Sequence, residues 1–215
     1  MKSTTRISKV KSPKRRSAPN TVNGTVPPRR VENAKLRPRE YLTVKEVAKL
    51  IDGARERGRH GHRDATMILV AYRHGLRVSE LSTLRWDQVD FERGLLHVRR
   101  VKSGTPSVHP LGGTELRSLR RLMREQPESR HVFLTERRSP MSPAGFRKML
   151  SRIGEESKFP FPVHPHMLRH ACGYKLANDG QDTRALQHYL GHKNIQHTVR
   201  YTELSAERFK SFWED

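Results

Sequence analysis

Residues 163–201 read V-H-P-H-M-L-R-H-A-C-G-Y-K-L-A-N-D-G-Q-D-T-R-A-L-Q-H-Y-L-G-H-K-N-I-Q-H-T-V-R-Y. This stretch holds His166, Arg169, His192 and Tyr201, and apolar positions at helical spacing lie between them. Side chains of these types can hold a phosphodiester, neutralise its charge and attack it. We therefore expect the rest of the chain to fold around this stretch.

The composition bounds the class of protein. A chain of 215 residues can form one domain with a buried core, alone or with a tail. The net charge of +21 at pH 7 indicates a polyanionic partner, because Lys and Arg release counterions from a phosphate backbone. Nucleic acid is the leading candidate. An anionic membrane surface is the alternative, but no basic amphipathic helix with a bulky aromatic face is evident.

The cysteine content and the N-terminus indicate where the protein resides. Its single cysteine, Cys172, excludes an internal disulfide and a cysteine zinc cluster, which fits a reducing compartment. The basic N-terminus lacks the apolar core of a signal peptide, and no run approaches the ~20 apolar residues of a membrane span. We expect a soluble, cytoplasmic protein without a membrane partner.

Residues 1–38 form a segment of distinct composition. They are rich in Lys, Arg, Ser, Thr and Pro and poor in large apolar side chains, which predicts a disordered arm. Residues 1–40 contain twelve Lys or Arg against Glu32 and Glu40, a net charge of +10. The arm is either a solvated tail or a source of nonspecific DNA affinity. We assign residues 39–215 to one folded domain.

The pattern of apolar residues after Tyr41 predicts a mainly α fold with a small antiparallel β-sheet, the α+β class. A capping box at Thr43 and Glu46 starts the first helix, and Gly75 ends the second. Strands are expected at 95–101 and 107–110, and a short apolar run covers 132–134. The other helical patterns cover residues 63–74, 114–124, 142–157, 165–178, 183–190, 195–201 and 206–213, and one more helix begins at Arg77.

Two candidate cations precede the opening stretch. Arg77 stands beside a predicted helix start, where its guanidinium could bind two phosphate oxygens, and Glu80 one turn away could hold an arginine in place. Lys102 lies in the predicted hairpin turn, from which a flexible ammonium could donate a proton to a leaving oxygen. Taken singly, either side chain could equally be an ordinary surface residue.

Histidines cluster around Arg169. His166 and Arg169 are three residues apart and share a helix face, and His166 and His170 have the i, i+4 spacing of a zinc pair, with His164 nearby. The zinc alternative is weak because no H-E-x-x-H glutamate accompanies them. A core or surface histidine is the other alternative for each.

His192 and Tyr201 complete the set of candidates. His192 follows a predicted helix stop at Leu190 and Gly191, so its ring should project from a turn. Tyr201 lies beside Arg200, and a phenol needs adjacent cations to become a useful nucleophile. A turn histidine and a core or surface tyrosine remain the ordinary interpretations of these two residues taken alone.

Together the candidates resemble the ordered signature of the tyrosine recombinases, the phage-integrase family. The resemblance spans about Tyr41 to Trp213 and rests on R-V-S-E-L at Arg77, H-M-L-R-H at His166, L-G-H at Leu190 and a tyrosine nine residues after His192. H-P-H-M-L-R-H-x-C-G and Y-L-G-H-x-N-I-x-H-T-V are most similar to the short recombinases of fimbrial phase variation, which lack a separate core-binding domain. The signature residues are Arg77, Lys102, His166, Arg169, His192 and Tyr201.

The resemblance implies a tyrosine recombinase catalytic-domain fold and a reaction through a 3′-phosphotyrosine. Tyr201 would attack the scissile phosphate while Arg77 and Arg169 stabilise its charge. Lys102 would act as general acid, and His166 and His192 would assist by proton transfer and hydrogen bonding. Neither a metal nor a nucleotide cofactor is implied.

The implied partners are double-stranded DNA, three further protomers in a homotetramer on two recombination sites, and accessory DNA-bending proteins. The resemblance also implies a nucleoid-associated protein whose C-terminal segment docks on a neighbouring protomer, with Phe209, Phe212 and Trp213 as apolar contacts. Two rivals stay open: a DNA-binding regulator of the same fold that does not cleave, and a metal-dependent nuclease. The sequence leaves inversion, integration and excision of a DNA segment as alternatives.

Overall fold

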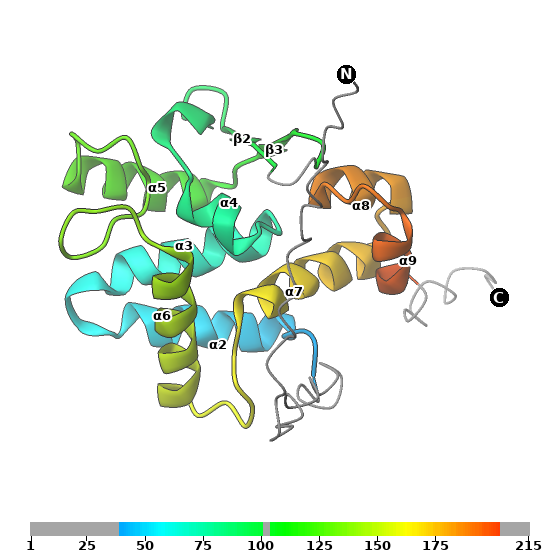
Figure 1. The fold of residues 1–215 in the computed structure, drawn as a ribbon, viewed down its shortest axis with the longest axis horizontal. Helices are drawn as coiled ribbons and strands as arrows, with labels where there is room; N and C mark the ends of the chain where they lie inside the picture. The colour runs from blue at the N-terminus through cyan, green and yellow to red at the C-terminus, as the bar shows by residue number, and fades with distance from the viewer. Residues whose placement is uncertain (1–38, 101–103, 203–215) are drawn as a thin grey trace, which may run out of the picture. The chain divides into compact units, whose positions relative to one another are not determined.

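Helices dominate the described part of the chain, residues 39–100 and 104–202, in a computed structural model (Figure 1). The helices are α2 (Val44–Arg55), α3 (Gly61–Arg73), α4 (Val78–Ser82), α5 (Gly113–Glu125), α6 (Pro143–Glu156), α7 (Pro165–Asn178), α8 (Thr183–Leu190) and α9 (Gln196–Thr202), with 3-10 turns η1 (Gly58–His60) and η2 (Trp86–Gln88). The strands are β1 (Val89–Asp90), β2 (Leu95–Val98) and β3 (Ser107–Pro110). The predicted α+β class is confirmed.

Local sequence signals account for several helix ends. The predicted capping box starts α2: the hydroxyl of Thr43 accepts from the backbone N–H of Glu46, and the Glu46 carboxylate accepts from that of Thr43. Helix α3 ends just before Gly75, which has a positive φ of 55°. Helices α7 and α8 have the predicted bounds, and α8 is capped by the carboxylate of Asp182.

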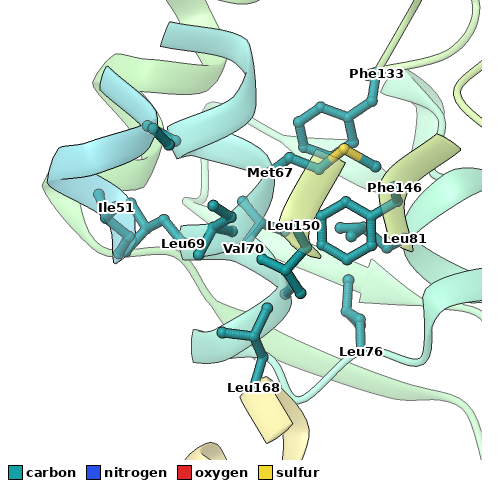
Figure 2. Packing of buried hydrophobic residues seen from close by; sticks show 14 of the residues in the cluster. Ile51, Met67, Leu69, Val70, Leu76, Leu81, Phe133, Phe146, Leu150 and Leu168 are labelled. Atoms are coloured by element: carbon teal, nitrogen blue, oxygen red, sulfur yellow. The ribbon is translucent and has the colours of Figure 1, made fainter. Parts of the chain in front are cut away.

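Helix α3 forms the centre of the fold. Every residue from Asp64 to Ala71 is buried, as expected for a helix that is covered on all sides. It packs most extensively against α2, α7 and α5. Figure 2 shows Met67 and Val70 of α3 among Phe146 and Leu150 of α6, so the two helices share one apolar core.

The sheet is small and antiparallel, in the order β1-β2-β3. Strand β2 pairs with β3, with Leu96 opposite His109, and ends at Val98 rather than at residue 101 as predicted. Strand β1 was not predicted, because two residues are too short for a period-2 pattern. The apolar run 132–134 is buried but pairs only through isolated bridges at its two sides.

Three predicted features lie outside the described residues: the basic arm at 1–38, the hairpin turn at 101–103 and the helix at 206–213. Within the described ranges, no helix combines the length and apolar character that crossing a membrane would require.

Candidate active site

Arg77 is held at the start of α4 by the carboxylate of Glu80. Glu80 accepts from the backbone N–H of Arg77 at 2.9 Å and from its Nη1 at 2.9 Å. Burial alone would raise the pKa of Glu80, but the bond from the Arg77 backbone and the charge of Arg100 lower it below the usual value. Glu80 is therefore ionised. The side chain of Arg77 is 29% exposed, so it remains open to a ligand.

Arg169 of α7 connects residues 75–77, which we call the Arg77 segment, to the end of α8. Its buried guanidinium donates to the backbone carbonyls of Gly75 and Leu190. Burial and the neighbouring charges of Arg77 and Arg100 lower the pKa of Arg169 to about 10. Arg169 therefore stays positively charged at neutral pH.

Arg100 joins Arg77 and Arg169 as a third arginine of the site, the arginine cluster, and it was not among the predicted site residues. Its side chain is fully buried, donates from Nη1 to Glu80 at 2.9 Å and donates from Nη2 to the carbonyl of Tyr189. Arg77 and Arg100 bind the Glu80 carboxylate directly, and Arg169 is near enough to feel its charge. These three guanidinium groups and one carboxylate carry a net charge of +2. An anionic ligand would compensate this charge.

One sequence signal could have identified Arg100. Leu96 and Val98 point into the core while His97 and Arg99 are exposed, so the period-2 alternation of β2 continues inward to the next residue. A basic residue in an inward position must find a buried partner. Adjacent arginines in a highly basic chain concealed this difference.

Tyr201 of α9 is seated against α7 and is 1% exposed. Its hydroxyl forms a 2.9 Å hydrogen bond with Nδ1 of His170, and the ring of Tyr174 meets its ring edge-on at 5.0 Å. Burial raises the pKa of Tyr201 to about 12, although the charge of Arg169 opposes this shift. The phenol is therefore protonated in the DNA-free protein.

His192 lies beside this tyrosine, and His166 lies next to its partner His170. His192 follows Gly191, whose left-handed backbone ends α8 as predicted, and its Nδ1 lies 2.9 Å from the hydroxyl of Thr198. The His192 ring stacks 6.2 Å from the Tyr201 ring. His166 is exposed on α7, with its ring 5.9 Å from that of His170.

The structure thus brings together five of the six predicted residues, Arg77, His166, Arg169, His192 and Tyr201, from α4, α7, the end of α8 and α9. Helices α7, α8 and α9 lie together on one side of the fold (Figure 1). Lys102 lies outside the described residues. Within the described ranges, no group of three or more His, Cys, Asp or Glu side chains is arranged to hold a metal ion.

Two neighbours of Tyr201 were not predicted as site residues. The sequence indicates His170 only as a possible zinc ligand or as a core or surface histidine, although it follows Arg169 directly and lies one helical turn from His166. Gly173 lies one turn further, and a Cβ there would come within 2.7 Å of Cζ of Tyr201. The i, i+3 and i, i+4 spacing along α7 was the available signal.

Replacing Gly173 by Ala should disturb the packing of the Tyr201 ring against α7. The added methyl group would overlap the Tyr201 ring, whose burial leaves it little room to move. We expect a loss of about 1–3 kcal/mol in the free energy of unfolding, measured by urea denaturation, despite the better helix propensity of Ala. Gly113→Ala in α5 is the control, because its added Cβ would meet only the end of the Arg117 side chain, at 3.3 Å. Equal stability of the two variants would contradict this packing.

The buried histidines predict a specific loss of stability in acid. Burial, with the charges of Arg169 and Arg77 for His192 and of Arg200 and His166 for His170, lowers the pKa of both to about 3. The contribution of the two neutral rings to the free energy of unfolding is complete above 6.5, the usual pKa of histidine. It is lost as the pH falls toward 3, because the histidines of the unfolded chain bind protons more strongly than those of the folded protein. Each ring contributes at most about 1.4 kcal/mol per pH unit, and partial exposure reduces this value.

Urea unfolding at pH 7.0, 5.5 and 4.5 measures this effect. A double variant, His170→Asn with His192→Asn, should lose less stability between pH 7.0 and 4.5 than the unaltered protein. His188→Asn replaces an exposed histidine of α8 and should leave the pH profile unchanged. Parallel profiles for all three proteins would show that the two buried rings do not carry this dependence.

This chain is similar to known proteins in both sequence and fold. The sequence profile of the phage integrase family matches residues 40–208. The type 1 fimbriae regulatory protein FimE of Escherichia coli K12 is 42% identical over 182 residues, which cover 82% of this chain and 91% of FimE. The tyrosine recombinase XerC of Pseudomonas syringae is 32% identical over 198 residues, covering 89% of this chain and 64% of XerC.

A solved structure agrees with this assignment at the level of the fold. The XerA recombinase superposes with a TM-score of 0.71 at 23% identity, over 81% of this chain and 65% of that chain. The match of the family profile to most of the chain and the identity to FimE confirm the resemblance that the motifs indicated. The protein therefore belongs to the phage integrase family and is a site-specific tyrosine recombinase.

Proposed function

We propose that this protein cuts and rejoins double-stranded DNA through a 3′-phosphotyrosine formed by Tyr201. The phenol gives up its proton as its oxygen bonds to the scissile phosphorus, the bond from phosphorus to the 5′ oxygen breaks, and that oxygen takes up a proton and leaves as a 5′-hydroxyl. The 5′-hydroxyl of a second strand then attacks the phosphotyrosine and reverses the step. The energy of the phosphodiester is kept in the protein linkage, so joining needs no separate energy source.

The side chains would divide the work by charge and position. Arg77 and Arg169 would stabilise the charge that develops on the phosphate oxygens, the interaction that usually contributes most to such catalysis. Lys102 would protonate the departing 5′ oxygen, while His166 and His192 would assist by proton transfer and hydrogen bonding.

One observation carries this proposal: Tyr201 shares its surroundings with the arginine cluster. The charge of Arg169 acts on the pKa of both Tyr201 and His192. Because the phenol is 1% exposed, we propose that DNA binding draws α9 away from its seat on α7 before attack. The net positive charge of the cluster supports a bound phosphate beside it.

A suicide substrate with a nick next to the scissile phosphate tests the proposal. We expect a covalent protein–DNA adduct, resistant to denaturant, with a free 5′-hydroxyl on the released strand, in the presence of a chelator. Binding without any adduct would instead support the regulator that does not cleave. Cleavage that needs a divalent ion and leaves no attached protein would support the nuclease.

We propose that the chain divides into a basic arm, residues 1–38, and a catalytic domain, residues 39–215. The family match over residues 40–208 supports the second range. Exchanging Lys14, Arg15 and Arg16 for Gln in the full chain tests the arm. If these side chains contact phosphates, nonspecific DNA affinity should fall and the slope of log K against log salt should flatten by roughly 2–3. An unchanged slope would support a solvated tail.

Assembly on DNA is a separate part of the proposal. A homotetramer on two sites would bring together the strands to be exchanged, with residues 205–215 docked on a neighbouring protomer and accessory proteins bending the DNA. Deleting residues 205–215 should abolish recombination between two sites, whereas full recombination by the shortened protein would contradict docking by this segment. Sedimentation of the complex with two-site DNA measures the number of protomers.

The resemblance to the fimbrial recombinases favours inversion of a DNA segment over integration or excision. This role would place the protein on the nucleoid. Mapping the genomic DNA that is trapped covalently on Tyr201 tests it. Two inverted sites flanking one segment would support inversion, whereas directly repeated sites or a mobile element would contradict it.

A further inference from the structure

Arg100 connects two parts of the site that are distant in sequence. On one side its Nη1 donates to the Glu80 carboxylate at 2.9 Å, and the same carboxylate holds the backbone and side chain of Arg77. On the other side its Nη2 donates to the carbonyl of Tyr189, in the last turn of α8 and three residues before His192. A single rigid guanidinium therefore spans both segments.

Arg169 makes a parallel connection at the same place. It joins the carbonyl of Gly75, two residues before Arg77, to the carbonyl of Leu190, next to that of Tyr189. The last carbonyls of a helix carry partial negative charge and bind cations well. Two arginines thus fix the end of α8 against the Arg77 segment.

Gly191 packs closely against the Arg100 side chain. A Cβ at residue 191 would lie 2.6 Å from Nε of Arg100, so any other residue would collide with the guanidinium. The left-handed backbone of Gly191 also ends α8 and sets the direction of the chain toward His192. Arg100 and Gly191 therefore form one packed unit next to the site.

Burial makes a purely packing role for Arg100 costly. Removing a guanidinium from water carries a large desolvation penalty, and an apolar side chain of similar volume would fill the same space without it. A planar fork with several donors can fix two acceptors in one geometry, which neither an apolar chain nor a lysine can do. Its charge also adds to that of Arg77 and Arg169.

We propose that Arg100 is a positioning residue of the phosphate site: it fixes Arg77 through Glu80 and His192 through the end of α8. This inference rests on the proposed DNA cleavage. Arg100 does not need to touch the DNA. It should matter most when negative charge develops on the phosphate, because the side chains it orients act on that charge.

Two nicked substrates separate this role from general damage to the fold. One carries an ordinary phosphodiester at the scissile position, and the other carries an uncharged methylphosphonate, in which a methyl group replaces one non-bridging oxygen. With saturating protein, Arg100→Met should cut the phosphodiester about tenfold to a hundredfold more slowly, but the methylphosphonate less than about threefold more slowly. The ratio of the two cleavage rates should thus fall by about tenfold.

Arg99→Met is the matched control. Arg99 is the adjacent residue, its side chain is 63% exposed, and its ion pair with Asp87 is on the surface. Both cleavage rates should stay within about threefold of the unaltered protein, as expected for an exposed pair. Arg100→Lys keeps the charge but cannot bridge both acceptors, so it should also lower the rate ratio. It carries the test if the urea midpoint shows that Arg100→Met does not fold.

The outcomes also separate this inference from the proposed function. If the unaltered protein forms no adduct, the proposed function itself fails. If the adduct forms but the Arg100 variants cut both substrates more slowly by the same factor, Arg100 only supports the fold and the inference is wrong. Unchanged rates on both substrates, or a loss explained entirely by DNA affinity, would overturn it as well.

Discussion

Replacing Tyr201 by Phe should abolish the covalent protein–DNA adduct while leaving the protein folded and bound to DNA. The change removes one oxygen, and with it the only atom of this side chain that can bond to phosphorus. The ring keeps its seat against Gly173 and Tyr174. Loss of the hydrogen bond to His170 should cost about 1 kcal/mol of stability, within the range of a typical bond.

Tyr174→Phe is the control for this prediction. Tyr174 contacts the Tyr201 ring in the same seat, so the variant removes a hydroxyl from the same surroundings. Denaturing gel electrophoresis of trapped complexes and a gel-shift titration measure adduct and binding for both variants. The adduct should persist in Tyr174→Phe and disappear in Tyr201→Phe. The reverse result would move the nucleophile to Tyr174, and an adduct in both would place it elsewhere.

The sequence predicted those features whose signals are local. Helices α7 and α8 have proline, aspartate or glycine at their ends, and each is long enough to show its period. The candidates Arg77, Arg169, His192 and Tyr201 were identified by order and spacing, and the fold brings all four together. Strand β1 was not predicted, because two residues are too few to show an alternation of buried and exposed side chains.

The buried contacts of the site could not be predicted from the sequence. Arg99 and Arg100 are identical in chemistry, and only the continued alternation of β2 separates the exposed one from the buried one. The partners of the buried arginine lie 20 and 89 residues away along the chain. Such contacts are fixed by packing between elements, which a local pattern does not describe. The seat of Tyr201 on Gly173 was missed for the same reason.

Replacing Arg169 by Ala should slow adduct formation by about a hundredfold to a thousandfold or more. The Arg169 guanidinium is buried within the site, and losing one donor that stabilises developing charge typically has an effect of this size. Single-turnover cleavage of the nicked substrate measures the rate. Arg184→Ala, on the exposed face of α8, should leave it within about threefold. Equal rates for the two variants would remove Arg169 from the catalytic set.

The same substitution should also destabilise the fold, and the two effects can be separated. Without Arg169, the carbonyls of Gly75 and Leu190 lose a buried donor, at a cost of about 1–3 kcal/mol each. Arg169→Lys keeps the charge but cannot reach both carbonyls with one planar group. If charge alone matters, the lysine variant should recover most of the cleavage rate while its urea midpoint stays low. If orientation matters, the cleavage rate and the urea midpoint should both stay low, because the arginine that would face the phosphate also holds α8 to the Arg77 segment.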